Sequence, residues 1–494
     1  MSSPPRRSSR PHSADSNETV HDAHPPPAPF TGGFFDKSPE AARARAAYFE
    51  VIIGGLVLLT ITIFGTLSIY WGALWKTDQH ISNLKGWIVD FDGGIIGETV
   101  VETFTGLRGE PMKITWEVHP ASSFPDGPSD VANAVINEKC WVALAVSAGA
   151  TARLNAAAGA MNSSYDGTTA ITALAVEARN EDGYRSLVKP NIDIPMDRLA
   201  FAFANQFLRN LTTNGQTNLT ALVSNAPQII TRPVYFTLDN LRPFDVPVAS
   251  AVTFVGLIYL LIISFIVALI STGARAAAGL DRRLSLRSLI AIRLTTSVTM
   301  YFILSLFYSL QSMAFQLPFD RKFGRAGFLV FWMIEWLGMT ALGLAIEAML
   351  TLLTPRFIPF FLVLWIISNV STCFYPLESL PGFYRYGYAT PFYNISRTVR
   401  TIVFSTHNEG TCAFAWTISS EYQLRLRLVG LNFGVLIVWI AISCITLPLF
   451  QWLSRSREVK AMRSQGQPLA TAAQADRSES QTSHNTPRSE KSSR

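Results

Sequence analysis

The chain has 494 residues, of which 49% are hydrophobic and only 15% are charged, and its formal net charge is +6. Soluble proteins carry about 25% charged residues, so this composition excludes an ordinary water-soluble protein and indicates a membrane protein. The basic residues flank apolar runs and do not gather on one soluble face. This pattern argues against nucleic acid as a partner and makes the lipid bilayer the expected surroundings.

The N-terminal region, residues 1–47, is rich in Ser, Pro, His and Arg over most of its length, and we predict a disordered cytosolic tail that ends in a short helix. Ser38 and Pro39 are typical of a helix start, with serine as the N-cap and proline in the first turn. The helix over residues 41–50 either lies in the headgroup layer or extends the first membrane span, and the sequence leaves both interpretations open.

Six apolar segments are long enough to be membrane spans, one before and five after a polar insert. They lie at residues 48–71, 248–270, 289–315, 328–353, 357–373 and 429–450. We therefore predict an α-helical integral membrane bundle of six transmembrane helices in a one-plus-five order. Residues 72–247 would form an extracytoplasmic α/β domain, residues 248–453 the membrane domain, and residues 454–494 a second disordered cytosolic tail.

Short basic loops set the predicted orientation, because Lys and Arg favour the cytosolic side. They follow the second span (Arg275, Arg282, Arg283, Arg287) and the sixth span (Arg455, Arg457, Lys460, Arg463). Both termini are then cytosolic, in a plasma membrane or an endomembrane. One loop disagrees, since Arg321, Lys322 and Arg325 fall on the side predicted to be outside.

Glycosylation sequons agree with this orientation. Those at Asn162, Asn210, Asn218 and Asn394 fall on the extracytoplasmic side, whereas those at Asn17 and Asn369 would have to be unused.

The insert alternates strand-like and helix-like segments, which indicates an α/β domain with a small sheet. Strands are predicted over residues 84–92, 139–147 and 169–180, and helices over residues 149–160 and 197–211.

Two segments, at residues 70–98 and 375–394, together with the one-plus-five order of spans, resemble the fungal nitrosoguanidine-resistance family of membrane proteins. That family is similar to the membrane subunits of ABC-2-type exporters, notably the bacterial phage-infection-protein group. The resemblance covers about residues 45–455. It implies membrane association, drug or mutagen resistance, export and a homodimer, but it supplies neither a substrate nor a catalytic residue.

Catalytic and cofactor motifs are absent from the sequence. It contains no GxxxxGK[ST] phosphate loop, no HExxH and no GxSxG, and its histidines and four cysteines have no metal-ligand spacing. We therefore expect no enzyme, no cofactor and no metal. If the chain belongs to an exporter, the ATPase is a separate chain or the energy comes from elsewhere.

Asp90 and Asp92, in the segment VDFDGG, form the closest acidic pair. Two carboxylates at strand spacing can bind a cation, but such a site needs about six oxygens and no third acid lies nearby before Glu98. The favoured interpretation is structural: the acids end a strand and hydrogen-bond the turn that Gly93 and Gly94 allow.

Charged and amide side chains within the spans are costly and usually face the bundle interior. Arg293 and Glu347 lie at matching depths from the cytosolic side of neighbouring antiparallel spans, so we expect them to pair. Glu335 lies nearer the outer face, at a depth comparable to Asn369. These residues either hold the bundle together or line a substrate or proton path, with Glu335 either protonated and bonded to Asn369 or facing a hydrated route.

Two further segments stand out. Residues 374–405 are dense in Tyr, Phe, Pro and Gly, which favours a re-entrant or interfacial hairpin of the kind that ABC-2-type subunits have, or else a plain interfacial loop. Ser285 follows Arg282 and Arg283 and fits a basophilic-kinase site, although these arginines are more simply explained as topology signals.

The favoured function is a transporter-like, ABC-2-permease-like membrane subunit that exports or excludes toxic amphipathic molecules. One alternative is a membrane scaffold or lipid-organisation protein without transport. A further alternative is a membrane accessory protein of a secondary-metabolite pathway.

Overall fold

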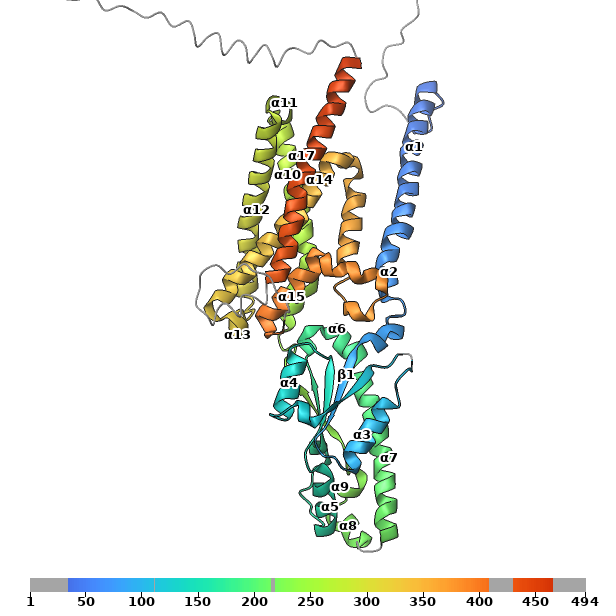
Figure 1. Cartoon of the computed structure of the whole chain (residues 1–494). Coiled ribbons are helices and arrows are strands. Elements are labelled where there is room, and N and C mark those ends of the chain that lie inside the picture. The colour runs from blue at the N-terminus through green and yellow to red at the C-terminus, as the bar shows by residue number, and fades with distance from the viewer. Residues whose placement is uncertain (1–33, 111, 215–217, 408–429, 465–494) are drawn as a thin grey trace, which may run out of the picture. The chain divides into compact units, whose positions relative to one another are not determined.

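The computed structural model describes residues 34–110, 112–214, 218–407 and 430–464. It divides into two compact units, residues 1–61 and 62–494, which are described separately. The first unit contains nearly all of α1 (Pro39–Thr62); only its last residue belongs to the second unit. This helix begins directly after Ser38, and the Ser38 Oγ atom accepts a hydrogen bond from the Ala41 amide (3.2 Å). The predicted helix start is therefore confirmed, and the short helix and the first apolar span form one continuous helix (Figure 1).

The second unit begins with the end of that helical run. The π-helical turn η1 (Ile63–Leu67) and α2 (Ser68–Leu74) complete a stretch, Pro39–Leu74, that is long and apolar enough to cross a membrane. A short 3-10 helix, η2 (Thr77–Asn83), then leads into the inserted domain.

The inserted domain contains a five-stranded mixed sheet in the order β2-β1-β3-β4-β5. Its strands are β1 (Lys85–Asp90), β2 (Thr115–Pro120), β3 (Val142–Val146), β4 (Ile171–Ala175) and β5 (Phe236–Asn240). Neighbouring strands are parallel except for β3 and β4. The three predicted strands are β1, β3 and β4, whereas the edge strands β2 and β5 were not predicted.

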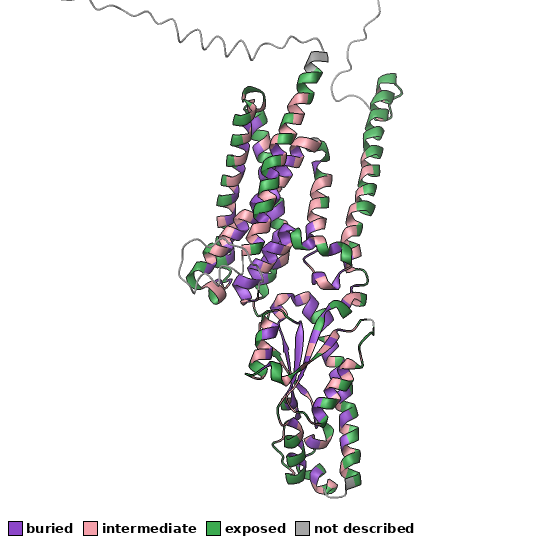
Figure 2. Cartoon of the chain, viewed as in Figure 1, coloured by how far each residue is buried: buried purple, intermediate pink, exposed green. Residues whose placement is uncertain are grey.

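Helices cover both faces of this sheet because successive side chains of a strand point to opposite faces. The longer helices α3 (Ile95–Thr105), α5 (Ala150–Ala160) and α7 (Pro190–Asn214) share a core with Ile88 and Leu144. On the other face, α4 (Pro128–Ile136) packs its apolar side on Val89, Ala145 and Leu174. Both predicted helices of the insert are confirmed, as α5 and α7. Within the inserted domain, Figure 2 shows buried residues along the central strands. Shorter helical turns connect these elements: η3 (Ala121–Ser123), η4 (Gly167–Ala170), η5 (Glu177–Arg179), α6 (Glu181–Gly183), η6 (Tyr184–Val188), α8 (Leu219–Asn225) and α9 (Gln228–Thr231).

Asp90 and Asp92 hold the first strand to the helices that follow. The Asp90 Oδ1 atom accepts hydrogen bonds from the amides of Asp92 (2.8 Å) and Gly93 (3.1 Å), and Gly93 has a φ of 61°. Asp92 accepts from the amide of Thr151 (3.0 Å) and from its hydroxyl, and so caps the N-terminus of α5. These bonds match the structural interpretation of the acidic pair. The described residues contain no cluster of three or more His, Cys, Asp or Glu that could hold a metal ion.

The remaining helices form the apolar part of the second unit. They are η7 (Pro247–Ala249), η8 (Ala251–Val255), α10 (Gly256–Ala277), α11 (Leu280–Arg283), α12 (Leu286–Ala314), α13 (Asp320–Phe323), η9 (Gly324–Ala326), α14 (Gly327–Val370), η10 (Leu377–Ser379), η11 (Gly382–Ala389), α15 (Pro391–Phe404) and α17 (Gly430–Ser464).

Five helical stretches of the described residues are long and apolar enough to cross a membrane. The predicted fifth span, residues 357–373, is represented by Arg356–Val370, a shorter apolar helix within α14. Its 15 residues extend about 22 Å, less than the hydrocarbon core of about 30 Å. Five of the six predicted spans therefore meet this length and composition, and the exact count of six stays a prediction.

The segment predicted as an outer hairpin consists of the 3-10 turns η10 and η11 followed by α15. Most residues of α15 are buried, so this helix is a packed element and not a plain loop. It contacts α10, α13, α14 and α17.

Arg321, in the loop that disagrees with the predicted orientation, is paired. Its guanidinium donates two hydrogen bonds to Asp245 (2.8 and 2.9 Å), which lies just before η7. These bonds hold the pKa of Asp245 below its ordinary value.

The four sequons differ in accessibility. Asn394 is 2% exposed, and its Nδ2 donates to the carbonyl oxygens of Tyr388 (3.0 Å) and Thr390 (2.8 Å). A glycan cannot be accommodated there, so the predicted glycosylation of Asn394 is wrong for this fold. Asn162, Asn210 and Asn218 are exposed.

This difference predicts the outcome of a glycosidase experiment. If residues 72–247 are extracytoplasmic, the wild type should shift in mobility after glycosidase treatment, and a variant with Gln at Asn162, Asn210 and Asn218 should not. Asn394→Gln alone should leave the shift unchanged. A C-terminal tag cleaved by protease on intact cells would contradict the orientation.

The capping role of Asp92 can be tested by thermal unfolding of the purified chain. Asp92→Ala should destabilise the inserted domain by about 1 kcal/mol, because the first amides of α5 lose their acceptor. Asp92→Asn should lose less, since an amide oxygen also accepts. Glu102→Ala, at an exposed position of α3, is the control; equal stability of the two alanine variants would disprove the cap.

Candidate functional site

The buried face of α12 is polar along the whole helix. Its buried residues are Leu289, Arg293, Ser297, Tyr301, Ser305, Ser309 and Ser312, mostly four residues apart. The opposite face is apolar, with Ile303 and Phe307 exposed. A membrane helix arranged in this way turns its polar side chains towards other helices, because the hydrocarbon core cannot solvate them.

The helices α10 and α14 receive this face. The Tyr301 hydroxyl donates to the Ser264 carbonyl oxygen of α10 (3.2 Å). A Cβ atom at Gly343 of α14 would lie 2.2 Å from the same hydroxyl, so only glycine leaves space for it. We call the buried polar residues of these three helices, apart from Asn369 at the end of α14, the polar column. They are Arg293, Ser297, Tyr301, Ser305, Ser309 and Ser312 of α12, Ser264, Ser271 and Arg275 of α10, and Glu335, Thr340 and Glu347 of α14.

The column ends, towards the predicted cytosolic side, in a cluster of charges. Glu347 Oε1 lies 2.9 Å from Arg293 Nε and 3.1 Å from an Nη atom of Arg275. Arg293 also donates to the Glu347 carbonyl oxygen (3.0 Å), to the Thr351 hydroxyl (2.7 Å) and to Gln451 of α17. The two residues expected to pair therefore lie together. The Arg293 guanidinium joins α12 to α14 and α17, and Arg275 adds α10 to the cluster.

Arg275 is the member of the cluster that sequence reasoning missed. It was interpreted only as a topology signal, yet it is 8% exposed and also lies 3.4 Å from Asp281. Its position at the C-terminal end of α10, at the same predicted depth as the other two charges, is the signal that would have found it.

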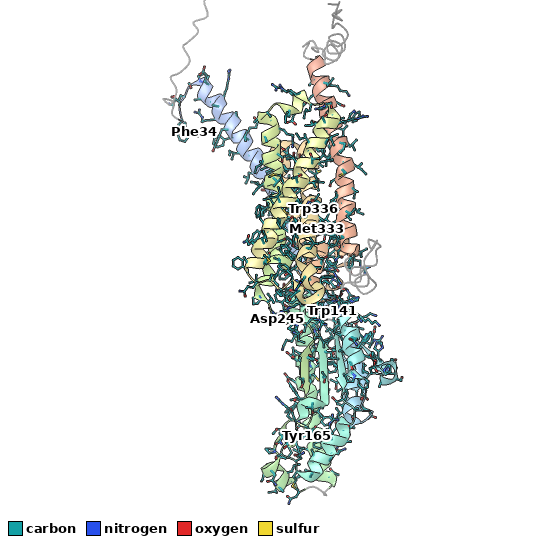
Figure 3. All side chains as sticks on the ribbon, turned by 90° about the vertical axis from the view of Figure 1, so that its left-hand side faces the viewer. Phe34, Trp141, Tyr165, Asp245, Met333 and Trp336 are labelled. Carbon is teal, nitrogen blue, oxygen red and sulfur yellow. The ribbon has the colours of Figure 1, made fainter. Side chains whose placement is uncertain are left out.

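Glu335 is fully buried near the other end of the column. Both of its carboxylate oxygens lack a hydrogen-bond partner among the described residues. The expected bond to Asn369 is wrong: the Asn369 amide donates to Trp365 O (2.9 Å) and accepts from the Phe392 amide (3.2 Å). Asn369 thus fixes the start of α15. Figure 3 labels Met333 and Trp336, the residues of α14 that flank Glu335 in the sequence.

A second set of charges joins the inserted domain to α15. Glu138 accepts from Arg397 (2.7 Å), and Arg400 bonds to Glu181. Arg179 lies 3.6 Å from Glu138 and 3.3 Å from Glu378. We call these three arginines and three glutamates the junction network. Burial makes such pairs costly to break, because the remaining charge is left without a partner.

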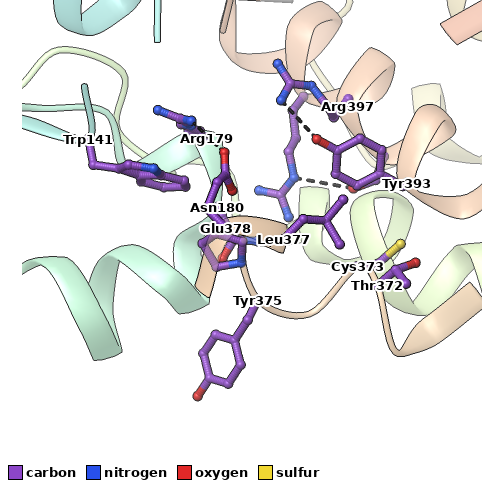
Figure 4. Close-up of a pocket in the computed structure, with 13 residues that line it drawn as sticks. Trp141, Arg179, Asn180, Thr372, Cys373, Tyr375, Leu377, Glu378, Tyr393 and Arg397 are labelled. Atoms are coloured by element: carbon purple, nitrogen blue, oxygen red, sulfur yellow. Dashed lines mark hydrogen bonds and ion pairs between the residues drawn. The ribbon is translucent and has the colours of Figure 1, made fainter. Parts of the chain in front are cut away.

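Four residues of the junction network, Arg179, Glu378, Arg397 and Arg400, line a small cavity of about 40 Å³, shown in Figure 4. The Arg179 guanidinium stacks on the Trp141 ring at 3.6 Å from its centroid, and the Tyr393 hydroxyl accepts from Arg397 (3.2 Å). This space suits about one water molecule. Burial raises the pKa of the nearby Cys140 thiol to about 12, which makes it a poor nucleophile.

Ser285, the expected phosphosite, is the N-cap of α12, and its Oγ accepts from the Ser288 amide (3.4 Å). It is exposed, and so are Arg282 and Arg283.

A family model described as a protein of unknown function, DUF3533, matches residues 55–445. An uncharacterized endoplasmic reticulum membrane protein of Saccharomyces cerevisiae is 26% identical over 472 residues, covering 88% of this chain and 86% of the yeast protein. No solved structure matches the chain. These matches support a multi-pass membrane protein. Neither description mentions nitrosoguanidine resistance or ABC-2-type exporters, so that part of the resemblance stays a prediction.

The charge cluster predicts a pattern of stability in purified protein. Glu347→Gln should destabilise the fold by about 3–5 kcal/mol, because it leaves the buried Arg293 without a carboxylate partner. Arg293→Gln should cost less, because Glu347 keeps Arg275 at 3.1 Å. The double variant should recover part of the loss in Glu347→Gln, since Arg275 keeps Asp281 as its partner. Thermal unfolding in detergent measures the effect, with the exposed Arg282→Gln as the control. Strictly additive losses in the double variant would show that Arg293 and Glu347 do not interact.

Proposed function

The chain belongs to the DUF3533 family, and we propose that it is a transporter-like membrane protein that exports toxic amphipathic small molecules and so confers resistance to them. The polar column is the observation that carries this proposal. Buried polar side chains in a membrane bundle are costly, and they commonly mark the route of a substrate or an ion. A polar interior behind an apolar surface suits a molecule that has both kinds of group.

Among the residues of the polar column, Glu335 is the one for which a purely structural role is the weakest explanation. The charge cluster at Glu347 binds helices together, whereas Glu335 has no partner among the described residues and joins nothing. A buried carboxyl without a partner costs folding free energy, and such costs are retained where a function needs them. We assign Glu335 to the route.

The energy source and the setting form part of the proposal. The sequence has no phosphate-binding loop, so a separate ATPase chain would drive export, and a homodimer would form the route, as the resemblance to ABC-2-type subunits implies. The location of the yeast relative supports an endoplasmic reticulum membrane.

Efflux of a fluorescent amphipathic cation from cells tests the function. Cells that express the wild type should clear the dye faster than cells without the protein. Glu335→Gln should keep normal abundance, because a neutral amide replaces an unpaired carboxyl, and should lose most of the difference in efflux. Glu102→Gln makes the same chemical change at an exposed position of the insert and should behave as the wild type.

Two results would overturn the proposal. One is equal efflux with and without the protein. The other is normal efflux in Glu335→Gln at normal abundance, which would remove Glu335 from the route.

A further inference from the structure

The turn η11 is fixed to the end of the first membrane span. The Tyr384 hydroxyl donates to the Ile69 carbonyl oxygen (2.7 Å), and a Cβ atom at Gly72 would lie 2.6 Å from that hydroxyl. Ala73, Leu377, Leu380 and Tyr384 form a small buried cluster at this contact. Since the span ends in the exposed residues Trp71 and Trp75, η11 lies level with the aromatic belt where lipid headgroups begin.

A polar groove of about 590 Å³ opens beside this turn. One wall is η2 with the starts of β1 and β2, and the other is η10 with η11. Asn83 holds the walls together by donating to the Glu378 carbonyl oxygen (3.0 Å). We call this space the boundary groove, and its polar lining includes His80, Asn83, Lys85, Glu378, Arg385 and Tyr388.

The boundary groove has more positive than negative charge available. Arg385 is exposed, and its guanidinium has no hydrogen bond or ion pair with any described residue. Lys85 pairs with Glu117 at 3.0 Å but keeps 59% of its side chain exposed. The acid of the groove, Glu378, already lies 3.3 Å from Arg179.

An apolar anchor lies beside these cations. Phe383, two residues before Arg385, is 70% exposed. At the level of the headgroups, an exposed aromatic ring partitions towards the acyl chains, while arginine and lysine reach the phosphates.

We propose that the boundary groove binds the phosphate headgroup of an anionic membrane lipid. Arg385 and Lys85 contact the phosphate, Asn83 and Tyr388 supply hydrogen-bonding groups, and Phe383 lies against the acyl region. A lipid is favoured over a free anion because the exposed Phe383, Trp71 and Trp75 place the groove where acyl chains are present. This site goes beyond the proposed export and does not require it.

The full-length protein, purified in detergent, provides the test. The probes are dioctanoyl phosphatidic acid, dioctanoyl phosphatidylcholine and inorganic phosphate, with binding measured by calorimetry. The wild type should bind phosphatidic acid more tightly than phosphatidylcholine, and Arg385→Gln should weaken binding of phosphatidic acid about fivefold. Arg385→Gln combined with Lys85→Gln should weaken it further, and Arg385→Lys should retain most of it.

The control is Arg209→Gln, which removes an exposed charge near the end of α7, outside the groove. It should bind phosphatidic acid as the wild type does. An unchanged elution profile of Arg385→Gln would show that the exposed substitution leaves the fold intact. Equal binding of phosphatidic acid by the wild type and Arg385→Gln would overturn the proposal. So would inorganic phosphate that binds as tightly as the lipid, because the site would then take a free anion.

Discussion

A guanidinium group inside a bilayer has no water to bind, so Arg293 must find its hydrogen-bond partners within the protein. It finds them on α14 and α17, while Glu347 also receives Arg275 from α10. Packing between membrane helices gains little from the hydrophobic effect, since lipid tails are as apolar as leucine. Hydrogen bonds and ion pairs between helices therefore decide which helices are neighbours. The serine-rich face of α12 continues this series of buried polar side chains towards Glu335.

The inserted domain is attached by the same kind of contact. Glu138 lies in the turn after α4 and Glu181 begins α6, and Arg397 and Arg400 come from α15. Because α15 also packs on α10 and α17, it couples the inserted domain to the helices of the bundle, beside the contacts of Asn83 and Arg179 with Glu378. The buried charges make the attachment specific, since a shifted docking would leave several of them unpaired.

The limits of the sequence reasoning follow from where each residue lies. The predicted strands β1, β3 and β4 are central, and strands buried on both faces have continuous apolar runs. The missed strands β2 and β5 are edges, with exposed residues such as Val118 and a polar sequence such as TLDN in β5.

Matching depth located Arg293 against Glu347, but depth says nothing about which face of a helix a residue occupies. For this reason the expected bond between Glu335 and Asn369 was wrong. The spacing of four residues from Arg293 to Ser309 was readable in the sequence and would have revealed the polar face of α12.

The single antiparallel contact in the sheet, between β3 and β4, determines how the polypeptide returns to the membrane. Because β1 is parallel to β3, and β5 to β4, β1 and β5 run in opposite directions. The chain leaves the bilayer along β1, and β5 carries it back to within hydrogen-bonding distance of α15, where Arg242 donates to Ser405 O (3.4 Å). In a fully parallel sheet β5 would end about 17 Å away, at the far edge, and a second connection across the domain would be needed. One reversed strand pair thus gives the domain an entrance and an exit on the same side, so it can be inserted between two membrane helices without a long linker.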